Sequence, residues 1–492
     1  MPTAIASDGA SKMTKRGVSS SGTTTVCRQR MWRWLGGGAV AVVLTVVVVF
    51  LAVWQTRKSW ESGDQDGRVD EGDAVRGESL VGSDTLLPQV LEEFVVETQC
   101  DSLFDCCDFF PSDNITESAE ACIALFNALQ KVLDKQVRRN RGKGGGVARV
   151  ESTDKGILWQ STSGRLYGGA DAPDMTLDTL FEIASITKTV TAAVVLKLVE
   201  AGRISLRDEV VDLLPDGAVP EGLLTVNGTD GTVNLTVWHL LSHRGGLPDF
   251  WDNWNFLEEY DADPNYDWTP QETIAWAAAM DKEFPPQTSI KGNFAYGDTN
   301  YVILGLLVEH LTGKALHKVF REAIFDPLDM NSTYMSYKEE PRTDAPLSHR
   351  YGYDSEDLHN VTRQAADWAS GGLISDVHDT SIFIRGFMEG RIIRPDTLAQ
   401  ALDAWQAFGS FSNASWVHYG LGTMKLQMDW IGLDVYGHVG YGNSYAFYSQ
   451  KRKLAVVGTV NNEGRGLWTR SVVPILEAVE AFLQRQSPAS ES

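Results

Sequence analysis

The pattern of apolar and polar positions changes sharply along the chain. An uncharged apolar run covers residues 35–54, and an acidic, glycine-containing stretch follows over residues 55–98. Only after residue 98 do apolar residues recur at helical or strand spacing. The pattern therefore predicts one folded region in the C-terminal part of the chain, preceded by segments of a different character.

The periodic positions predict both strands and helices. Strands are expected at 147–152 and 156–164, joined by a tight turn, and again within 436–449 and 453–462. Helices are expected at 119–137, 185–202, 269–282, 300–313, 376–390 and 472–483. Strands at both ends with helices between them predict an α+β fold, with one sheet built from both ends of the region.

The apolar run at 35–54 has the length that a helix needs to cross about 30 Å of hydrocarbon. Tryptophans stand at both of its ends, and the charged residues before it are basic except for Asp8. This predicts a single-pass type II membrane protein with a cytoplasmic tail at 1–34, an acidic stalk at 55–98 and an extracellular or luminal remainder. The Ser/Thr-rich basic leader also resembles a mitochondrial presequence, so a mitochondrial membrane is the alternative.

Two further features agree with the secretory pathway. Six N-x-Ser/Thr sequons follow the apolar run, at Asn114, Asn227, Asn234, Asn331, Asn360 and Asn413. Residues 99–146, predicted as a stem with a leading helix, hold four cysteines, namely Cys100, Cys106, Cys107 and Cys122. Four cysteines permit two disulfides, whose pairing the sequence leaves open. A zinc site is disfavoured because the cluster lacks histidine and regular C-x2-C spacing.

The charge of the chain limits its partners. Against 43 basic residues stand 65 acidic ones, a net charge of −22, which excludes a nucleic acid bound through a broad basic surface. The apolar fraction of 43% and aromatic fraction of 10% are those of a folded protein. Residues 486–492 are expected to form a short C-terminal tail, and the oligomeric state is left open.

The sharpest chemical signal is Ser185 followed three residues later by Lys188. At the start of a helix this spacing places the hydroxyl and the ammonium on one face. Backbone N–H groups at a helix N-terminus can also hold an oxyanion, so the arrangement suits a nucleophilic serine with a neighbouring base. Ser152 and Lys155 share the spacing but lie in the predicted hairpin turn, which we interpret as surface structure.

Residues 181–215 resemble the active-serine segment of the serine β-lactamase and penicillin-binding-protein superfamily, in particular its class C-like branch of D-peptidases and esterases. Four further motifs follow in that family's order: HLLSHRGGLP at 239–248, YGDTNY at 296–301, ASGGLIS at 369–375 and GHVG at 437–440. The resemblance covers about residues 147–485. It implies an antiparallel sheet flanked by helices, a helical subdomain, and a site between the two.

The resemblance also implies a role for each matching residue. Ser185 attacks a carbonyl and forms an acyl-enzyme, while Lys188 and Tyr296 share proton transfer. The backbone N–H groups of Ser185 and Tyr441 form the oxyanion hole, and Gly440 belongs to the substrate cleft. No metal or organic cofactor is implied.

Two departures from the family pattern change the expected chemistry. Asp298 stands where the motif has Asn, and a carboxylate beside Lys188 favours the ammonium over the free amine. We therefore expect Tyr296, its pKa lowered by that cation, to take the Ser185 proton. His438 stands where the family has Lys and would orient substrate or support Tyr296. Without a permanent cation at that position, recognition of a substrate carboxylate is weakened, which favours simple esters or amides.

The sequence thus predicts a membrane-anchored serine hydrolase acting through an acyl-enzyme on a small-molecule or peptide ester or amide. One alternative is a binding or assembly ectodomain that kept the scaffold and lost turnover. Another is a true β-lactamase or D,D-peptidase. Zinc hydrolysis is disfavoured because Leu240 stands between His239 and His243 where a zinc-binding helix needs Glu.

Overall fold

The computed structural model describes residues 115–139, 143–226, 228–263, 266–281, 284–286, 293–352, 357–359, 363–403, 406–407, 416–462 and 467–486. These residues belong to one compact unit, Glu97–Ser492. The predicted tail, membrane segment (35–54) and stalk lie outside the described residues. Among the described helices, none has both the length and the apolar character that spanning a membrane requires.

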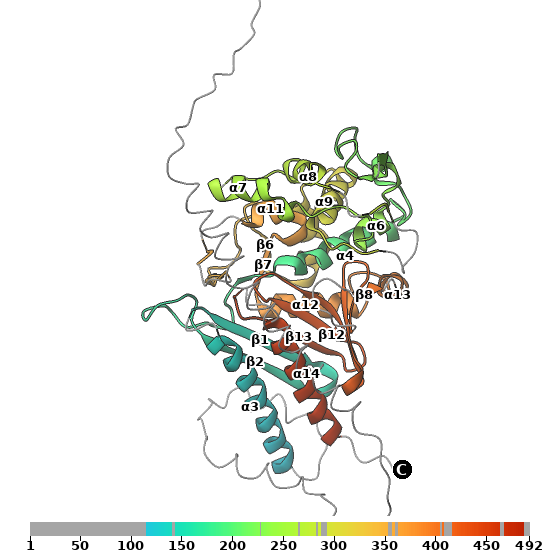
Figure 1. The fold of residues 1–492 in the computed structure, drawn as a ribbon. Coiled ribbons are helices and arrows are strands. Elements are labelled where there is room, and N and C mark those ends of the chain that lie inside the picture. Colours follow the sequence, from blue (N-terminus) through green and yellow to red (C-terminus); the bar gives the residue numbers. More distant parts are fainter. Residues whose placement is uncertain are drawn as a thin grey trace, which may run out of the picture. The chain divides into compact units, whose positions relative to one another are not determined.

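An antiparallel sheet of eight strands lies at the centre of the domain (Figure 1). Its order is β2-β1-β13-β12-β11-β10-β9-β8. The strands are β1 Gly145–Ser152, β2 Ile157–Gly164, β8 Gln406–Ala407, β9 Val417–Tyr419, β10 Met424–Met428, β11 Leu433–Val439, β12 Tyr445–Ser449 and β13 Leu454–Thr459. The N-terminal strand β1 pairs with the last strand β13, with Val147 opposite Thr459. The prediction that both ends of the region build one sheet is confirmed.

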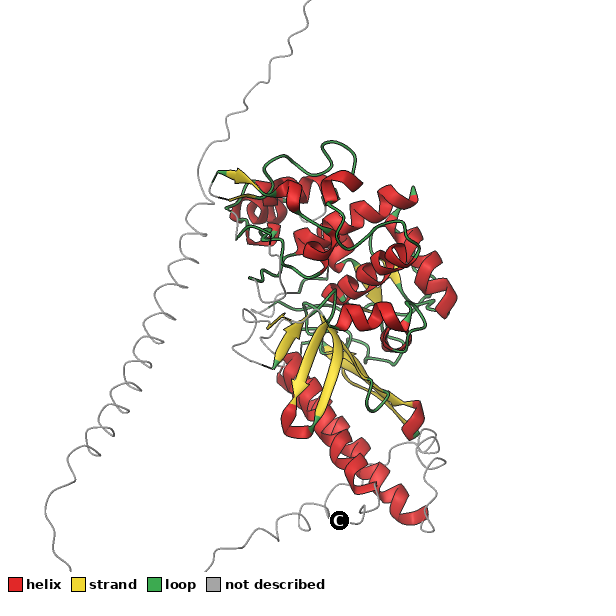
Figure 2. Cartoon of the chain, turned by 90° about the vertical axis from the view of Figure 1, so that its right-hand side faces the viewer, coloured by secondary structure: helices red, strands yellow, loops and turns green. Residues whose placement is uncertain are grey.

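Helices cover both faces of this sheet, and alternating side chains along the strands meet them. Val456 of β13 belongs to a core shared with α3 (Ile115–Arg139) and α14 (Leu467–Gln486). Its neighbour Val457 belongs to the other core, shared with α12 (Val377–Met388) and the helical region. Figure 2 shows the strands as a layer between these long helices and the larger group of helices.

The helix α3 is part of the domain core. Cys122, Leu125, Leu129 and Leu133, spaced three or four residues apart, are all buried in the cluster that includes the sheet. The sequence predicted this helix but assigned it to a stem before the domain. That assignment missed the packing because the surfaces that bury the apolar stripe, α14 and one face of the sheet, come from the other end of the chain.

Some predictions outside the active site fall on described residues. Cys122 packs as a core residue, whereas Cys100, Cys106 and Cys107 lie outside the described residues, so the disulfides stay a prediction. Asn234 and Asn331 are exposed, as glycosylation requires. The other four sequons lie outside the described residues, at Asn114, Asn227, Asn360 and Asn413. Glycosylation also stays a prediction.

The helical region is made mainly of the chain between β2 and β8. Its helices are α4 Thr187–Glu200, α5 Val210–Leu213, α6 Val237–Leu241, α7 Trp254–Ala262, α8 Pro270–Ala278, α9 Asp298–Thr312, α10 Leu316–Phe320, α11 Arg363–Gly371 and α13 Pro395–Leu402. Thr269 and Glu272 form the capping box that begins α8, with Pro270 at its first position. That helix ends at Ala278, before the predicted residue 282.

Two small sheets complete the described elements. One joins β3 (Phe181–Glu182) to β7 (Leu373–Ser375) and β7 to β6 (Tyr334–Met335), and the other is the hairpin of β4 (Thr225–Val226) and β5 (Thr229–Asp230). The first is important for function because β3 leads directly to Ser185. Its pairing with β7 brings the ASGGLIS segment beside the serine.

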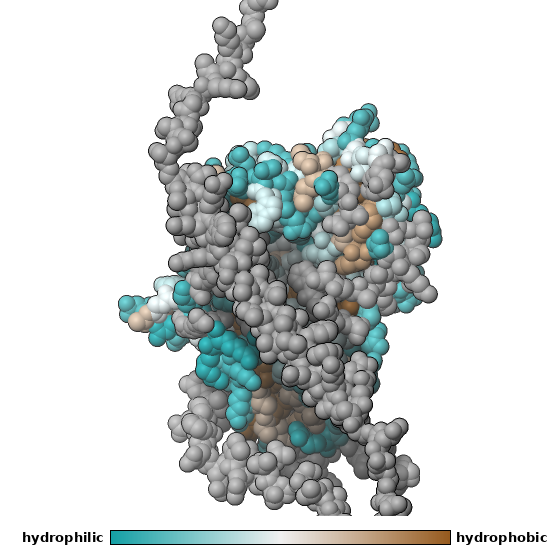
Figure 3. Space-filling model, viewed as in Figure 1, coloured by the Kyte–Doolittle hydropathy of each residue, from teal (hydrophilic) through white to brown (hydrophobic). Residues whose placement is uncertain are grey.

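The described surface mixes polar and apolar residues on the face drawn in Figure 3. Trp254, at the start of α7, is 80% exposed, although Phe250 and Phe256 nearby are buried. Single exposed aromatic residues of this kind are common on soluble domains and do not by themselves mark a binding site.

Candidate active site

Ser185 lies in a short 3₁₀ turn that leads directly into α4. The residue before it, Ala184, has a φ of 45°, a left-handed conformation that is strained for a residue with a Cβ. Neighbouring segments hold the turn, because Ile183 N donates to Leu373 O at 3.0 Å and Ser444 Oγ donates to Ile183 O at 3.0 Å. Ser185 remains partly exposed at the mouth of the helix.

Lys188 is fully buried in the first turn of α4 and donates to three acceptors. Its Nζ lies 3.0 Å from Ser185 Oγ and 3.0 Å from Ser370 O, and it also pairs with the Asp298 carboxylate. Burial by itself lowers the pKa of Lys188, but the charge of Asp298, with a smaller contribution from Tyr296, more than offsets this and raises the pKa. Lys188 is therefore an ammonium in the resting site, as the presence of Asp298 predicts.

Tyr296 lies over the same ammonium. Lys188 Nζ is 4.9 Å from the centre of its ring, and its hydroxyl interacts with both Lys188 and Ser185. Burial raises the pKa of Tyr296 to about 12, because the opposing effect of Lys188 is smaller and Asp298 adds to the rise. Lys188 acts in the expected direction, but desolvation of the phenol outweighs it, so the expectation of a lowered pKa for Tyr296 is wrong. Tyr296 is neutral in the resting site.

Gly440 and Tyr441 approach the serine turn from the end of β11. A Cβ at position 440 would lie 2.3 Å from Ile183 O and 3.0 Å from the Ala184 Cβ, so only glycine permits this contact. The close approach brings the next residue, Tyr441, beside the turn, as an oxyanion hole shared with Ser185 requires. The Tyr441 ring is 37% exposed, so it also forms part of the accessible surface here.

His438 lies behind the site and is only 1% exposed. Its Nε2 is 3.2 Å from the Tyr419 hydroxyl, its Nδ1 is 2.6 Å from Val439 O, and its ring centre is 6.2 Å from that of Tyr296. Burial, assisted by the charge of Lys188, lowers the pKa of His438 to about 3, so the ring is neutral. Because the ring is buried, the expectation that it orients substrate is wrong. Support for Tyr296 is the role that fits its position.

Three features of the site were missed by sequence reasoning. His243 lies against Tyr296 with a ring-centre separation of 4.5 Å, and Tyr419 links His243 to His438. The loop motif marked His243 without indicating what it contacts, and Tyr419 belongs to no motif. The third is the backbone carbonyl of Ser370, whose role the ASGGLIS motif cannot reveal because a carbonyl has no sequence signature.

The carboxylates around the serine are either shifted toward the neutral form or paired with a cation. Burial and the nearby Asp298 charge raise the pKa of the half-buried Asp249 well above its usual range, and the same two causes raise the pKa of the exposed Asp252. Arg350, which lies against the Tyr441 ring, pairs with Glu182 at 2.9 Å. The surroundings are therefore poorly suited to binding a carboxylate of a substrate.

One group of described residues has the spacing of metal ligands but a structural explanation. Ligand atoms of Asp376, His378 and Asp379 lie within 4.8 Å of one another. Asp376 caps α12 by accepting from the Asp379 N–H, and Asp379 accepts from Ser332 N and from Thr333. These bonds account for both carboxylates, Asp376 as a helix cap and Asp379 as an acceptor for the segment before β6.

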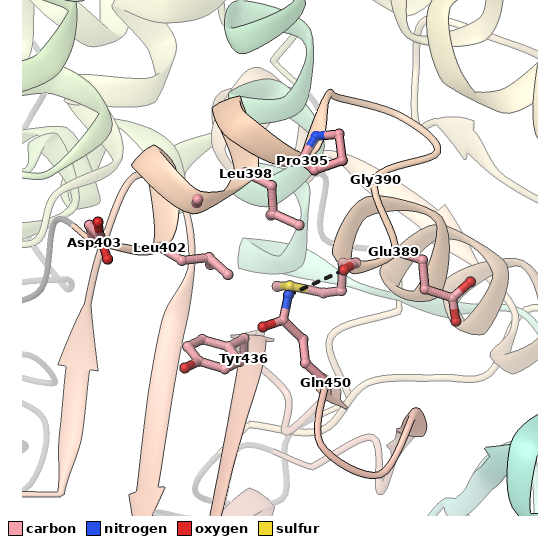
Figure 4. A pocket seen from close by; sticks show the side chains of 10 residues that line it. Glu389, Gly390, Pro395, Leu398, Leu402, Asp403, Tyr436 and Gln450 are labelled. Atoms are coloured by element: carbon pink, nitrogen blue, oxygen red, sulfur yellow. Dashed lines mark hydrogen bonds between the residues drawn. The ribbon is translucent and has the colours of Figure 1, made fainter.

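A pocket of about 390 Å³ lies apart from the residues around Ser185, between the end of α12, α13 and the sheet (Figure 4). Gln450 donates to Met388 O across it. Its lining residues are Met388, Glu389, Gly390, Pro395, Leu398, Ala399, Leu402, Asp403, Tyr436 and Gln450. None of these belongs to the group around Ser185, so we do not assign the chemistry to this pocket.

The sequence profile of the family described as Beta-lactamase matches residues 135–470. The chain belongs to this family. The match begins within α3, in agreement with the packing of that helix into the domain. Unguisins hydrolase ungD' of Aspergillus campestris is 29% identical over 248 residues, which is 48% of this chain and 42% of that protein. Penicillin-binding protein 4 of Amycolatopsis lactamdurans is 28% identical over 296 residues, covering 58% of this chain and 72% of that protein.

Solved structures of an amidohydrolase and an amidase share the fold. A D-stereospecific amidohydrolase from Streptomyces sp. has 28% identity and a TM-score of 0.59, covering 72% of this chain and 97% of that one. The D-amino acid amidase of Ochrobactrum anthropi SV3 has 24% identity and a TM-score of 0.61, covering 73% and 99%. The predicted α+β fold with its antiparallel sheet is confirmed, and three of these four relatives are named as hydrolases or amidases. Of the unguisins hydrolase, however, the chain spans less than half the length.

Proposed function

We propose that this domain is a serine hydrolase that cleaves an ester or amide through an acyl-enzyme on Ser185. The observation that carries the proposal is the 3.0 Å hydrogen bond between Lys188 Nζ and Ser185 Oγ at the mouth of α4. The Lys188 ammonium donates its three N–H groups to Ser185, Asp298 and the Ser370 carbonyl. It therefore polarises the serine hydroxyl and does not act as a free base. The Ser185 proton then passes to Tyr296, which interacts with both groups.

The reaction proceeds in two balanced halves. Ser185 Oγ forms a bond to the carbonyl carbon while its proton moves to the phenolate form of Tyr296, and the carbonyl oxygen becomes an oxyanion facing the N–H groups of Ser185 and Tyr441. The bond to the leaving alcohol or amine then breaks, and the leaving group takes the proton from Tyr296. Water attacks the acyl-enzyme by the same route, which releases the acid and restores Ser185.

The base form of Tyr296 is scarce at neutral pH. With a pKa of about 12, forming the phenolate at pH 7 costs roughly 7 kcal/mol. The neighbouring ammonium of Lys188 stabilises that phenolate, which is why the two groups act as a pair. The rate is therefore expected to rise with pH well above neutrality.

The acidic surroundings favour substrates without a carboxylate beside the scissile bond. The exposed Asp252 would repel such a group, Lys188 is already paired with Asp298, and His438 is neutral where a lysine would attract it. The likeness to hydrolases named for D-amino acid amides and for unguisins supports amides as well as esters. We propose neutral or amine-bearing esters and amides over penicillins and cephalosporins.

The cellular placement that we propose rests on the sequence. The apolar run at 35–54 and the exposed sequons at Asn234 and Asn331 support a type II membrane protein with its hydrolase domain outside the cytosol. Glycosidase treatment of the membrane fraction is expected to increase the gel mobility of the protein. Unchanged mobility together with import into mitochondria would favour the alternative membrane.

An active-site fluorophosphonate probe tests the proposed function. We expect it to label the full-length protein and Ser152→Ala, which removes the other serine with the S-x-x-K spacing, but not Ser185→Ala. A panel of a p-nitrophenyl ester, D- and L-amino acid amides and a chromogenic cephalosporin then ranks the substrates. Absence of both labelling and hydrolysis in the folded wild type would overturn the proposal and favour a binding ectodomain.

A further inference from the structure

His243 binds the backbone on both sides of Tyr296. Its carbonyl oxygen accepts from Ala295 N at 3.0 Å, and its ring Nδ1 accepts from Gly297 N at 3.3 Å. The peptide groups on both sides of Tyr296 are therefore hydrogen-bonded to one residue, His243. No other contact in the site fixes the tyrosine through its own flanking backbone in this way among the described hydrogen bonds.

The conformation of His243 makes this double contact feasible. Its φ is 56°, in the left-handed region, so that the carbonyl and the ring turn toward the same segment, residues 295–297. The ring also packs on Tyr296, with centres 4.5 Å apart and planes tilted by 38°. His243 is fully buried, and burial keeps its pKa well below the usual value, so the ring is neutral.

A neutral histidine accepts at Nδ1 only when its proton is on Nε2. The Nε2–H of His243 then donates to the Tyr419 hydroxyl at 3.2 Å, and Tyr419 donates to Nε2 of His438 at 3.2 Å. The remaining proton of His438, on Nδ1, donates to Val439 O at 2.6 Å. The Tyr419 hydroxyl also contacts the Tyr301 hydroxyl. The direction of the chain is set by its two ends, where the Gly297 N–H donates to one histidine and the Val439 carbonyl accepts from the other, and these ends fix both tautomers.

We propose that His243 is the positioning residue that holds Tyr296 over Lys188, and that Tyr419 and His438 keep it in the tautomer that can do so. This inference rests on the proposed function, because it concerns how the proton acceptor for Ser185 is placed. It also explains His438, since a lysine there would have no acceptor for the Tyr419 proton and would break the chain.

Two substitutions of His243 separate positioning from mere filling of space. His243→Asn places an amide oxygen close to the Nδ1 position, and Asn tolerates a left-handed φ. His243→Gln is closer in size to His but carries its oxygen farther out, near the Nε2 position. We expect Asn to keep the rate of Ser185 phosphonylation by the fluorophosphonate within about fivefold of wild type, and Gln to lower it by about 10- to 100-fold.

A variant of Tyr419 and the tautomers of the two histidines complete the test. Tyr419→Phe retains the ring but removes the relay, and we expect a loss of about tenfold in acylation with no change in substrate KM. In ¹⁵N-histidine spectra of the wild type, His243 is expected as the Nε2–H tautomer and His438 as Nδ1–H, with neither titrating between pH 5 and 8.

Specific results would overturn the inference. Equal acylation rates for His243→Asn and His243→Gln in folded proteins would do so, and so would a His243 signal of the Nδ1–H tautomer. The spectra do not require activity, so they remain decisive if a variant fails to fold. Conversely, a wild-type protein with the expected tautomers but no Ser185 labelling would contradict the proposed function alone.

Discussion

Tyr296 lies between two buried polar groups that meet the cost of burial in opposite ways. On one side, Lys188 keeps its charge because Asp298 pairs with it. On the other side, His243 and His438 give up any charge, and hydrogen bonds through Tyr419 satisfy their nitrogens. We call these the charged side and the neutral side of Tyr296.

The difference shows how one phenol can be both reactive and well placed. A buried charge costs free energy unless it is paired, and the charged side therefore holds an ion pair. The protonation of this side can change during the reaction. A neutral chain with every donor and acceptor matched has one low-energy arrangement, so the neutral side fixes geometry. We therefore expect changes on the charged side to alter rate and pH dependence, and changes on the neutral side to alter placement and acid stability.

Removal of the ammonium should have the largest effect. Lys188→Met leaves the volume nearly unchanged but leaves the Tyr296 phenolate and Ser185 without a cation. We expect the rate of Ser185 phosphonylation by the fluorophosphonate to fall by about 1000-fold or more. The matched control is Lys197→Met, which removes another lysine of α4 whose Nζ donates to Ile392 O and should leave the rate nearly unchanged.

A loss of less than tenfold in a folded Lys188→Met protein would contradict the charged side as described. It would mean that Tyr296 takes the proton without help from the cation. Circular dichroism and thermal melting establish folding, because the substitution also leaves the carboxylate of Asp298 without its partner.

The carboxylate of the charged side sets the pH dependence. Asp298 raises the pKa of both Lys188 and Tyr296, so Asp298→Asn should lower both and make a basic group more available. We expect the rising limb of the rate–pH profile to move to lower pH by about one unit, which corresponds to roughly tenfold faster acylation at pH 7.

Two variants delimit the interpretation of that shift. Asp252→Asn removes an exposed carboxylate near the site and should move the profile by a small fraction of a unit. Tyr296→Phe should lower the rate at every pH and abolish the rising limb. If Asp298→Asn leaves the profile unchanged, the carboxylate does not control the protonation of this pair, and the proposed route through Tyr296 is wrong.

The charged side was largely predictable from the sequence, and the neutral side was not. The spacing of Ser185 and Lys188 places them on one helix face, and the family resemblance implied Tyr296 and Asp298 beside them. The structure brings the four residues together. Tyr419 has no such signal, because it comes from a short strand and its value lies in the three-dimensional register of β9 with β10. Contacts between residues far apart in the chain leave little trace in a single sequence.

The same distinction applies to the direction of the pKa shifts. The sign of the Lys188 shift followed from one neighbour, Asp298, and the structure agrees with it. The sign for Tyr296 did not follow, because it depends on the competition between desolvation and two opposing charges. The fold was easier, since apolar alternation and helix caps such as that at Thr269 are local, but the place of α3 depended on its distant partner α14.

The neutral side should make the domain sensitive to acid. His438 has a pKa of about 3 when folded and about 6.5 when unfolded, so between these values the unfolded state binds the extra proton. Stability contributed by this histidine is therefore lost as pH falls below about 6.5, by roughly 1 kcal/mol per pH unit. His438→Asn should reduce the loss of unfolding free energy between pH 6 and 5 by about that amount.

His378 provides a control of opposite sign for this measurement. Its pKa is raised by a hydrogen bond with Asp379, so its contribution is present at low pH and lost as pH rises. His378→Asn should therefore not reduce the acid sensitivity measured by urea unfolding at pH 6 and 5. An unchanged slope in His438→Asn would show that the ring is already charged or exposed in the folded protein.

Tyr301→Phe should have the smallest effect, and it tests where the neutral side ends. Tyr301 also packs on His243, with ring centres 5.2 Å apart, but its hydroxyl donates to Leu241 O at 3.0 Å. Loss of that bond leaves Leu241 O with the Gly422 N–H as its remaining partner and should lower the free energy of unfolding by about 0.5–1.5 kcal/mol. Acylation should change less than threefold, because Tyr419 still fixes the tautomer of His243. A loss as large as that of Tyr419→Phe would extend the positioning chain to Tyr301.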